Sequence, residues 1–518
     1  MSTPLIPRQR RRVTATKAAI KAVAMAVSSI SASLALMLAG CASSGPGAST
    51  PADQRLQQAG VPLTLPVGAG APAELAPAAW RDWVREPRLV AWVELALKHN
   101  RDLRVAMLNV QRAQALLTAT EANRLPTVGA GLNAVRAPNT KGSEANTLTA
   151  GLQLSSWEID LFGRLANLSE AARAQLLSTE AGRQAAELTL VAAVVQAGLA
   201  LQADDELLAL ARQSLDSREQ TLKLTALRES AGAASLLELQ AQQTLTAQGR
   251  VALAQFSRQQ SQDLNTLALL LGQPVTALGA VASPPLPTPA VTSTPPATPA
   301  TPTAAATRPP PPPAAPLASA LADERWLAEV PAGLSSAVLL RRPDVIAAEQ
   351  TMRAAQANMG AARAAFWPSL SLTGQGGVGS SQLAGLFNSG AFVYTLAANA
   401  LFTVFDAGRR QANVASAEAA QQIAQAQYER AIQSAFRDTA DGLAGLATWR
   451  EQGIAQRQQR DAARDTARLV GLKASVGAAS VLEQLDAQRS LFAAEQAVLQ
   501  VRLAELNNRV TLYKALGG

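Results

Sequence analysis

Few side chains in this 518-residue chain have the types and spacing that catalysis or metal binding requires. There is one cysteine, Cys41, and one histidine, His99. A Cys/His metal cluster needs several such residues, and a cysteine nucleophile needs a histidine base elsewhere in the chain. The sequence also lacks a Gly-x-Ser-x-Gly elbow, a phosphate-binding loop and a His-rich motif. It therefore indicates no enzyme, no cofactor and no metal site.

The cysteine has another explanation. A basic stretch followed by an apolar run from Ala22 to Leu38 is typical of an export signal, and the run is too short and too rich in serine for a membrane span. Leu38–Cys41 reads Leu-Ala-Gly-Cys and resembles the bacterial lipobox, in which the cysteine is lipidated, for example with palmitate. Ala42 after it favours the outer membrane by the same resemblance. The alternative is an ordinary signal that contains a cysteine by chance.

The signal also accounts for most of the positive charge. Residues 1–40 hold six Lys and Arg side chains and no acid, so their removal takes six charges from a formal net charge of +8. The sequence pI of about 10.1 is therefore mostly a property of the signal. No basic patch argues for nucleic-acid binding.

A short stretch that ends in a glutamate occurs twice in the sequence. The stretch Gly232–Glu238 reads Gly-Ala-Ala-Ser, two apolar residues and Glu, and the same pattern recurs 245 residues later at Gly477–Glu483. A repeat of this length means one structural unit used twice. Each copy follows about 65 residues of helical pattern without proline. We expect two long helical hairpins with these stretches at their tips, and a duplicated coiled-coil spacer is the alternative.

Hydrophobic periodicity defines the remaining helices. Apolar residues three or four apart predict helices at 101–124 and 165–229 and a return helix that ends at 271. The second half has corresponding helices, of which the first covers 344–365. A helix of about 65 residues is about 100 Å long, and two shorter helices placed end to end match that length. The predicted fold class is mainly α with a small β part, built from a duplicated repeat of a helical hairpin and a β-hairpin.

A period of two predicts four strands, at 128–134, 148–154, 369–375 and 394–404, with a Gly/Ser loop at 376–390. Strands of about 10 residues have membrane-spanning length. Four strands leave two open edges, which hydrocarbon does not tolerate, and known barrels begin at about eight strands. Several chains must then share one barrel, and three chains give twelve strands. A small solvent-exposed sheet is the alternative.

These elements divide the chain into five parts. Residues 1–40 form a lipoprotein signal peptide, and 41–79, rich in Ala, Gly, Pro and Ser, form a lipidated flexible tether. The first repeat covers 80–275 and the second covers 331–518. Between them, residues 276–330 form a proline-rich linker or insert, because about half of the 29 prolines lie there. A proline-rich ligand for a partner is an alternative interpretation of that segment.

Several motifs together resemble the outer-membrane efflux protein family of the TolC type, and in particular its lipoprotein branch. They are Leu38–Cys41, Trp157–Arg164, Leu339–Val345, Phe366–Leu370, Phe405–Arg409 and Leu512–Gly518. The resemblance covers nearly all of the mature chain except the tether and the proline-rich segment. It implies a homotrimer with a 12-stranded outer-membrane β-barrel on a long periplasmic α-barrel, lipid-anchored and spanning the outer membrane.

The resemblance also implies partners and sites. The channel would be the passive, porin-like exit duct of a tripartite efflux system for drugs and other toxic small molecules. A periplasmic adaptor (membrane fusion) protein would join it to an inner-membrane transporter of the resistance–nodulation–division (RND) type. Small residues at the tips would contact the adaptor, and further residues would shape the two strand-to-helix turns. The tip residues are Gly232, Ala233, Ala234, Ser235, Gly477, Ala478, Ala479 and Ser480, and the turn residues are Asp160, Gly163, Arg164, Asp406, Gly408 and Arg409.

The family narrows its periplasmic mouth with an acidic ring just past the second tip. By position Glu483 and Asp486 fall there, on one helix face by their spacing of three, and Glu238 corresponds to Glu483 in the first repeat. Three-fold copies of such acids would attract cations, and ties to Arg228 or Lys473 could hold the mouth shut. An ordinary solvated acidic face is the alternative.

Two other functions remain open at this point. Type I protein secretion uses channels of the same family, although the lipobox favours small-molecule efflux by resemblance. A structural lipoprotein that spans the periplasm without a pore is of a different class, and the alternating strand faces argue against it.

Overall fold

The computed structural model describes residues 51–63, 65, 79–138, 144–273, 321, 326–327, 336–382, 384 and 392–518. The chain forms two compact units, 1–55 and 56–518. Of the first unit only residues 51–55 are described, and helix α2 (Ala52–Gln58) begins there. The predicted signal peptide and Cys41 lie outside the described residues.

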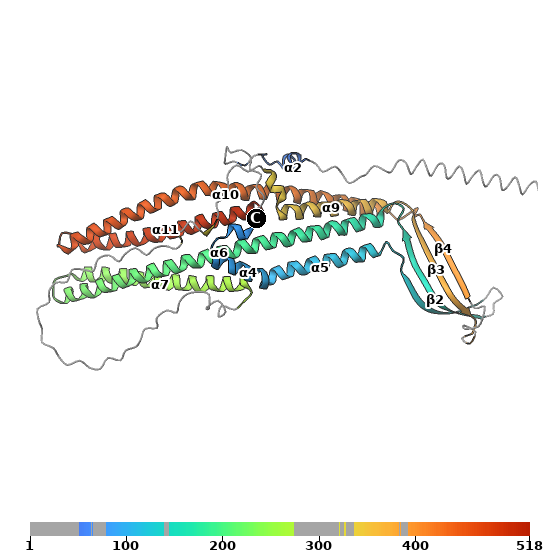
Figure 1. Ribbon diagram of the computed structural model, residues 1–518, viewed down its shortest axis with the longest axis horizontal. Helices are drawn as coiled ribbons and strands as arrows, with labels where there is room; N and C mark the ends of the chain where they lie inside the picture. The colour runs from blue at the N-terminus through green and yellow to red at the C-terminus, as the bar shows by residue number, and fades with distance from the viewer. Residues whose placement is uncertain are drawn as a thin grey trace, which may run out of the picture. The chain divides into compact units, whose positions relative to one another are not determined.

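The helical part consists of two repeats with the same order of elements (Figure 1). The first contains α5 (Arg101–Ala122), α6 (Arg164–Ser230) and α7 (Leu236–Leu271). The second contains α9 (Pro343–Ala364), α10 (Arg409–Ser475) and α11 (Val481–Ala515). Both long helices have 67 residues, and α6 and α10 start 245 positions apart. This confirms the mainly α fold class with its duplicated repeat.

Each long helix packs along two shorter ones. Helix α6 contacts α5 and α7, and α10 contacts α9 and α11. The two repeats also pack against each other, because α6 contacts α9 and α11 as well. At 1.5 Å per residue, α6 and α10 are each about 100 Å long. The helical part is therefore two layers of antiparallel helices in which a pair of shorter helices faces one long helix.

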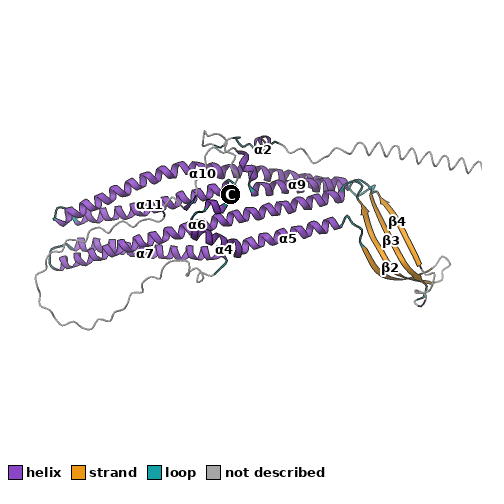
Figure 2. Cartoon of the chain, in the orientation of Figure 1, coloured by secondary structure: helices purple, strands orange, loops and turns teal. Residues whose placement is uncertain are grey.

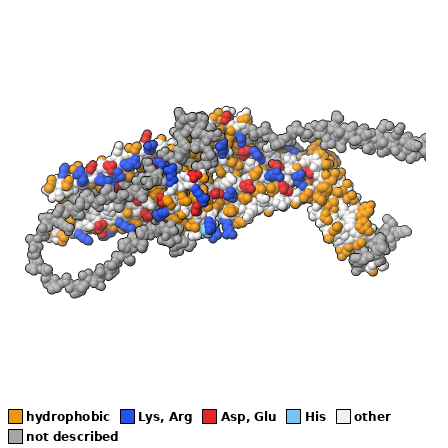
Figure 3. Space-filling view, in the orientation of Figure 1, with side chains coloured by type: hydrophobic (Ala, Val, Ile, Leu, Met, Phe, Trp, Pro, Cys, Tyr) orange, Lys and Arg blue, Asp and Glu red, His pale blue; other side chains and the backbone are white. Residues whose placement is uncertain are grey.

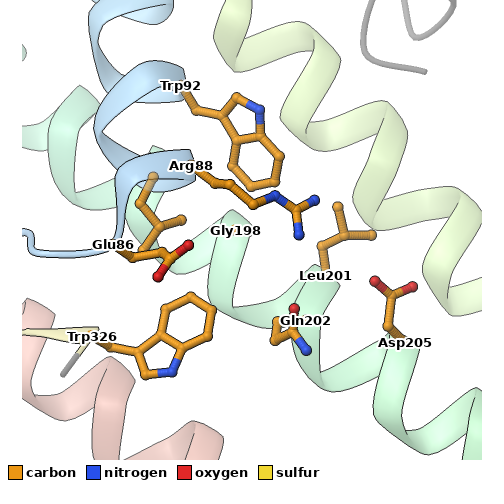
Figure 4. Close-up of a pocket in the computed structure, with 9 residues that line it drawn as sticks. Glu86, Arg88, Trp92, Gly198, Leu201, Gln202, Asp205 and Trp326 are labelled. Atoms are coloured by element: carbon orange, nitrogen blue, oxygen red, sulfur yellow. The ribbon is translucent and has the colours of Figure 1, made fainter. Parts of the chain in front are cut away.

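The largest core lies around the middle of α6. Its apolar residues Leu190–Leu199 pack against α4 (Pro87–His99), α7 and α11. A Cβ at Gly198 would come within 3.1 Å of the Trp92 ring, so only glycine lets α4 approach this closely. The pocket beside this contact (Figure 4) has a volume of about 10 Å³, roughly one water molecule, and is not a ligand site.

The C-terminal end of the chain packs against the same region. The ring of Trp83, in α3 (Trp80–Trp83), stacks on Tyr513 of α11 with centroids 4.1 Å apart. Buried Arg342 donates from Nη1 to the carbonyl of Ala515 at 2.9 Å and pairs with Asp344 at 2.6 Å. The Leu339–Val345 motif, which begins in the 3-10 helix η3 (Ser336–Arg341), therefore holds the C-terminus of α11.

Parts of the predicted tether and linker are packed rather than free. Leu56, Ala59 and Val61 are buried against Ile432 and other residues of α9 and α10. From the proline-rich segment, Leu321 and Leu327 are buried in the large core. The Leu321 amide donates to Glu206 and its carbonyl accepts from Arg502, each at 2.9 Å. Isolated apolar residues inside Pro- and Ala-rich sequence thus suffice to return the chain to the core.

The four strands form one antiparallel sheet, separate from the helices (Figure 2), in the order β1-β2-β3-β4. They are β1 (Val128–Pro138), β2 (Glu144–Ile159), β3 (Ser369–Ser380) and β4 (Phe392–Leu401). The predicted loop at 376–390 is wrong at its start, because residues 376–380 continue β3. Glycines obscure the alternating pattern there and yet pair in the ladder, as Gly377 does with Gly151. The fourth strand ends at Leu401, so the prediction that it reaches 404 is also wrong.

Candidate functional site

The sheet has one apolar face that no other described part of the chain covers. Leu132 on β1, Leu152 on β2, and Tyr394 and Leu396 on β4 point to this face and are 60% to 78% exposed. Figure 3 shows hydrophobic side chains gathered over the strands. A contiguous exposed apolar face marks a contact with lipid or with another protein. The apolar side chains stop at Arg136 and Asn146, which pair with each other at the far end.

The opposite face is polar. Asn133, Gln153, Gln375, Thr395 and Asn399 alternate with the apolar residues along their strands, so they point to the other side. Such a two-sided sheet fits a wall between hydrocarbon and water.

Both outer strands, β1 and β4, have an edge without a partner strand among the described residues. The four strands alternate in direction, so the two edges run antiparallel to each other. A β4 edge can therefore pair with the β1 edge of a second copy and continue the antiparallel ladder. Only a closed ring of such sheets leaves no edge exposed to lipid.

The first strand-to-helix turn is built from the predicted residues. Gly163 has φ +78°, a left-handed conformation that favours glycine, at the N-cap of α6. The Asp160 carboxylate accepts from the amide of Ala166 at 2.7 Å and so caps the first turn of the helix. Arg164 donates two hydrogen bonds to the carboxylate of Glu158, and these bonds connect the helix to the end of β2.

In the second turn the aspartate and the glycine are two positions apart instead of three, and a different arginine is used. Gly408 has φ +84°, and Ala407 before it has φ +54°. The Asp406 carboxylate accepts from the Gly408 amide at 3.1 Å and from Nε of Arg410 at 2.7 Å. The guanidinium of Arg410 also lies 5.2 Å from the centre of the Phe366 ring. The cation that pairs with Asp406 is therefore Arg410, the residue after the predicted Arg409, which starts α10.

The two hairpin tips have the same backbone geometry. Gly232 and Gly477 have φ +70° and +75°, and the amide of the following alanine donates to the carbonyl of Arg228 or Lys473, at 2.7 and 2.8 Å. This is the Schellman end of a helix, in which a left-handed glycine lets the chain turn back. The return helices begin directly afterwards, and the tips point to the end of the helical part away from the sheet (Figure 1).

A reciprocal capping box starts each return helix. Ser235 Oγ accepts from the Glu238 amide at 3.2 Å, and the Glu238 carboxylate accepts from the Ser235 amide at 3.1 Å. Ser480 and Glu483 make the same pair of bonds at 3.2 and 2.9 Å. The repeated Ser-x-x-Glu spacing is thus explained by helix capping, and the Ser-x-x-Glu pattern is a known sequence signal for it. Glu238 and Glu483 each have this capping role whatever else they do.

The candidate constriction residues lie at the tips, but nothing there pairs them with a cation. Glu483 and Asp486 are exposed, and Glu238 is half-buried. In the part of the chain that the structure describes, Arg228 and Lys473 form no ion pair with these carboxylates. Nor does any group of three or more His, Cys, Asp or Glu residues in the described ranges have the arrangement of a metal site.

One helix is apolar enough to raise the question of a membrane-spanning helix. Among the described residues, α6 alone has a stretch of that length and hydropathy. Its apolar residues around Val194 and Val195 are fully buried against the neighbouring helices. They belong to the core of the helical part.

Comparison with known proteins identifies the class that this geometry defines. The family model described as outer membrane efflux protein matches residues 92–273 and 334–518. The chain therefore belongs to the outer membrane efflux protein family, a family of channel proteins rather than of enzymes. It is an outer-membrane component of an efflux system, with the sheet as its membrane part and long helices on the periplasmic side.

Relatives and solved structures agree with this assignment. The chain is 36% identical over 447 residues to the probable efflux pump outer membrane protein TtgC of Pseudomonas putida, covering 85% of this chain and 84% of the relative. It is 34% identical over 450 residues to outer membrane protein OprJ of Pseudomonas aeruginosa, covering 85% and 86%.

Among structures, CusC has a TM-score of 0.72 at 32% identity, covering 88% of this chain and 100% of the other. The open state of the MtrE outer membrane channel of Neisseria gonorrhoeae has a TM-score of 0.70 at 31% identity, covering 88% and 98%.

Proposed function

We propose that three copies of this chain form a 12-stranded barrel in the outer membrane, continued by a helical duct in the periplasm. The observation that supports it is the four-stranded sheet, which has an apolar outer face and two antiparallel open edges. The duct is a passive exit for small molecules such as drugs and toxic compounds. Energy comes from an inner-membrane RND-type transporter, and a periplasmic adaptor bridges the two.

The assembly test uses the mature lipoprotein extracted from membranes in detergent. We expect a trimer by mass measurement, discrete channel conductance in planar lipid bilayers, and restored drug resistance in a strain that lacks its own exit duct but keeps adaptor and transporter. A stable monomer without conductance would contradict the proposal and would favour a structural lipoprotein.

The tips are proposed as the adaptor contact, because Gly232–Ser235 and Gly477–Ser480 present small side chains. Glycine is a poor residue to replace there, since its positive φ would strain any substitute. Ala233 and Ala478 are exposed and have ordinary backbone angles. Ala233→Trp with Ala478→Trp should abolish efflux while leaving the trimer intact. Ala420→Trp, at an exposed site on α10, is the control and should retain efflux.

The exposed acids at the second tip are proposed as the constriction. Glu483→Gln separates charge from structure, because glutamine also completes a capping box but carries no charge. With Asp486→Asn it should lower cation preference and leave thermal stability unchanged. Ser480→Ala is the matched control: it weakens the cap by about 1 kcal/mol and keeps both charges. Unchanged ion selectivity in the Gln/Asn double variant would show that these acids are an ordinary solvated face.

Lipidation at Cys41 would tether each copy to the inner leaflet through residues 41–79. We expect palmitate to label the wild-type chain and not Cys41→Ser. If the wild-type chain is not labelled either, the proposed lipidation is contradicted. Residues 276–330 are proposed as a proline-rich linker or insert between the repeats.

A further inference from the structure

The register of the sheet places three uncharged polar side chains in one row across three strands. Gln153 of β2 pairs with Gln375 of β3, and Gln375 pairs in turn with Thr395 of β4. All three point to the polar face, opposite Leu152 and Leu396. Within the described chain no side-chain hydrogen bond ties them to a neighbour, so their polar groups are available to water or solute.

The rest of that face is also without formal charge in the middle of the strands. On β1 it presents Gly129, Gly131, Asn133, Val135 and Ala137. On the other strands this face also presents Thr147, Thr149, Gly151, Ser369, Ser371, Thr373, Gly377, Gly379, Val393, Ala397, Asn399 and Leu401.

The exception on this face is Glu158, at the helix end of β2 opposite Ser371. Two hydrogen bonds from Arg164 neutralise its carboxylate. Arg136 lies on the other face, because it is an even number of residues from Val128 and Leu132 along β1. The described strands therefore contribute no uncompensated charge to the polar face.

Two glycines bring β2 and β3 close together on the polar face. A Cβ built on Gly151 would lie 2.6 Å from the Cα of Gly377, and both glycines point to the polar face. At this place the polar face therefore has no room for a side chain on either strand.

From these observations we infer that the row Gln153, Gln375 and Thr395 forms an uncharged belt around the barrel lumen, and that the barrel passes cationic, anionic and neutral solutes without sorting them by charge. This rests on the proposed trimer, in which the row occurs three times. An amide offers both donors and acceptors, and a hydroxyl does the same, so the belt can hydrate a solute of either sign. Charge selection then falls to the helical portion.

The test compares neighbouring cysteines on opposite faces of one strand. Gln153→Cys and Gln375→Cys point to the proposed lumen, and Leu152→Cys points to the lipid side. Each is treated in intact outer membranes with a cationic and an anionic water-soluble methanethiosulfonate. The wild-type chain, whose single cysteine is Cys41, serves as the blank.

We expect both glutamine positions to react and Leu152→Cys to remain unmodified. The ratio of the two reaction rates should match that of free cysteine in solution to within about twofold, because a charged cleft raises the local concentration of the opposite sign by about tenfold or more. A tenfold preference for either reagent would overturn the inference. Equal modification of Leu152→Cys and Gln153→Cys would instead show that the sheet is not a wall between lipid and water, and so would overturn the proposed barrel.

A second measurement uses reversal potentials in planar bilayers under a salt gradient. Gln375→Glu and Gln375→Lys should shift the potential in opposite directions, and Gln375→Asn should leave it at the wild-type value. No shift in either charged variant, with conductance intact, would remove the belt from the conduction path.

Discussion

The guanidinium carbon of Arg218, on α6 in the first repeat, lies 4.9 Å from the centre of the Phe492 ring on α11 in the second. Arg218 is 4% exposed and donates from Nη1 to the carbonyl of Leu245 on α7 at 3.1 Å. Burial, with a smaller effect of Arg489, lowers the pKa of this guanidinium. A single buried cation thus joins three helices from both repeats on the side of the core that leads to the tips.

Arg218→Met should lower the free energy of unfolding by about 2 kcal/mol, because it removes the guanidinium hydrogen bond to the Leu245 carbonyl and takes the cation from the aromatic face. Thermal unfolding of the detergent-extracted protein measures this. Arg212→Met, at an exposed site one and a half turns earlier on α6, should change stability little. Equal effects of the two substitutions would mean that the contact with Phe492 does not stabilise the helical part.

Asp204 provides a pH-dependent test of the same core. It is 5% exposed on α6, and burial, followed by its hydrogen bond with Asp263, raises its pKa to about 7. The folded state then holds a proton that the unfolded state has lost above pH 4, so stability should fall as pH rises from about 4 to 7. The full displacement corresponds to at most about 4 kcal/mol.

Asp204→Asn cannot ionise, so it should unfold at a higher temperature than wild type at pH 8 and at a similar temperature at pH 4. Asp216→Asn is the control and should keep the wild-type pH profile. The Asp216 carboxylate lies on the exposed side of α6 and accepts a hydrogen bond from Gln220. A profile for Asp204→Asn that falls as steeply as that of wild type would contradict this assignment.

The second strand-to-helix turn holds Ala407 in a left-handed conformation, with φ +54°. For a residue with a Cβ this costs about 1 kcal/mol or more. Ala407→Gly should therefore stabilise the protein by about 1 kcal/mol, seen as a higher unfolding temperature. Ala415→Gly, at an exposed position within α10, should destabilise it by about the same amount. A loss of stability in both variants would show that the turn is not strained.

The two glycines where β2 and β3 approach each other give a test of the sheet. Gly151→Ala would bring its Cβ against the backbone of Gly376 and Gly377, which has no side chain to move aside. We expect a cost of about 3 kcal/mol or a failure to assemble, measured as loss of the trimer in detergent. A Cβ at Gly129 meets nothing within 4 Å, so Gly129→Ala should assemble normally. Normal trimers with Gly151→Ala would disprove the close approach.

Sequence patterns predict well the parts of this fold that depend on local periodicity. The long helices appear within one or two residues of their expected ends, since an uninterrupted run without proline and a glycine at each tip define them. The capping boxes at Ser235 and Ser480 are equally predictable, because the Ser-x-x-Glu spacing is a sequence signal for them. The extension of β3 through Gly376–Ser380 is not predictable in this way, because glycine has no side chain to show the alternation.

Contacts between distant segments cannot be predicted from local sequence patterns. Nothing local in the sequence relates Arg218 to Phe492 or Trp83 to Tyr513, because each pair depends on how two helices lie against each other. The charge-free row on the sheet likewise becomes visible only when the register aligns Gln153 with Gln375. Periodicity assigned each residue to a face, and the ladder alone determined which residues are neighbours.

The return of the chain to the core at Leu321 has a practical consequence. Leu271, at the end of the first repeat, and Leu321 are both buried in the same cluster, and each is held there by its own neighbours. The halves on either side of the intervening residues therefore do not need a continuous peptide bond to find their places. A gene cut between codons 273 and 321 should yield two polypeptides that co-assemble when expressed together, which gives a route to labelling one repeat at a time.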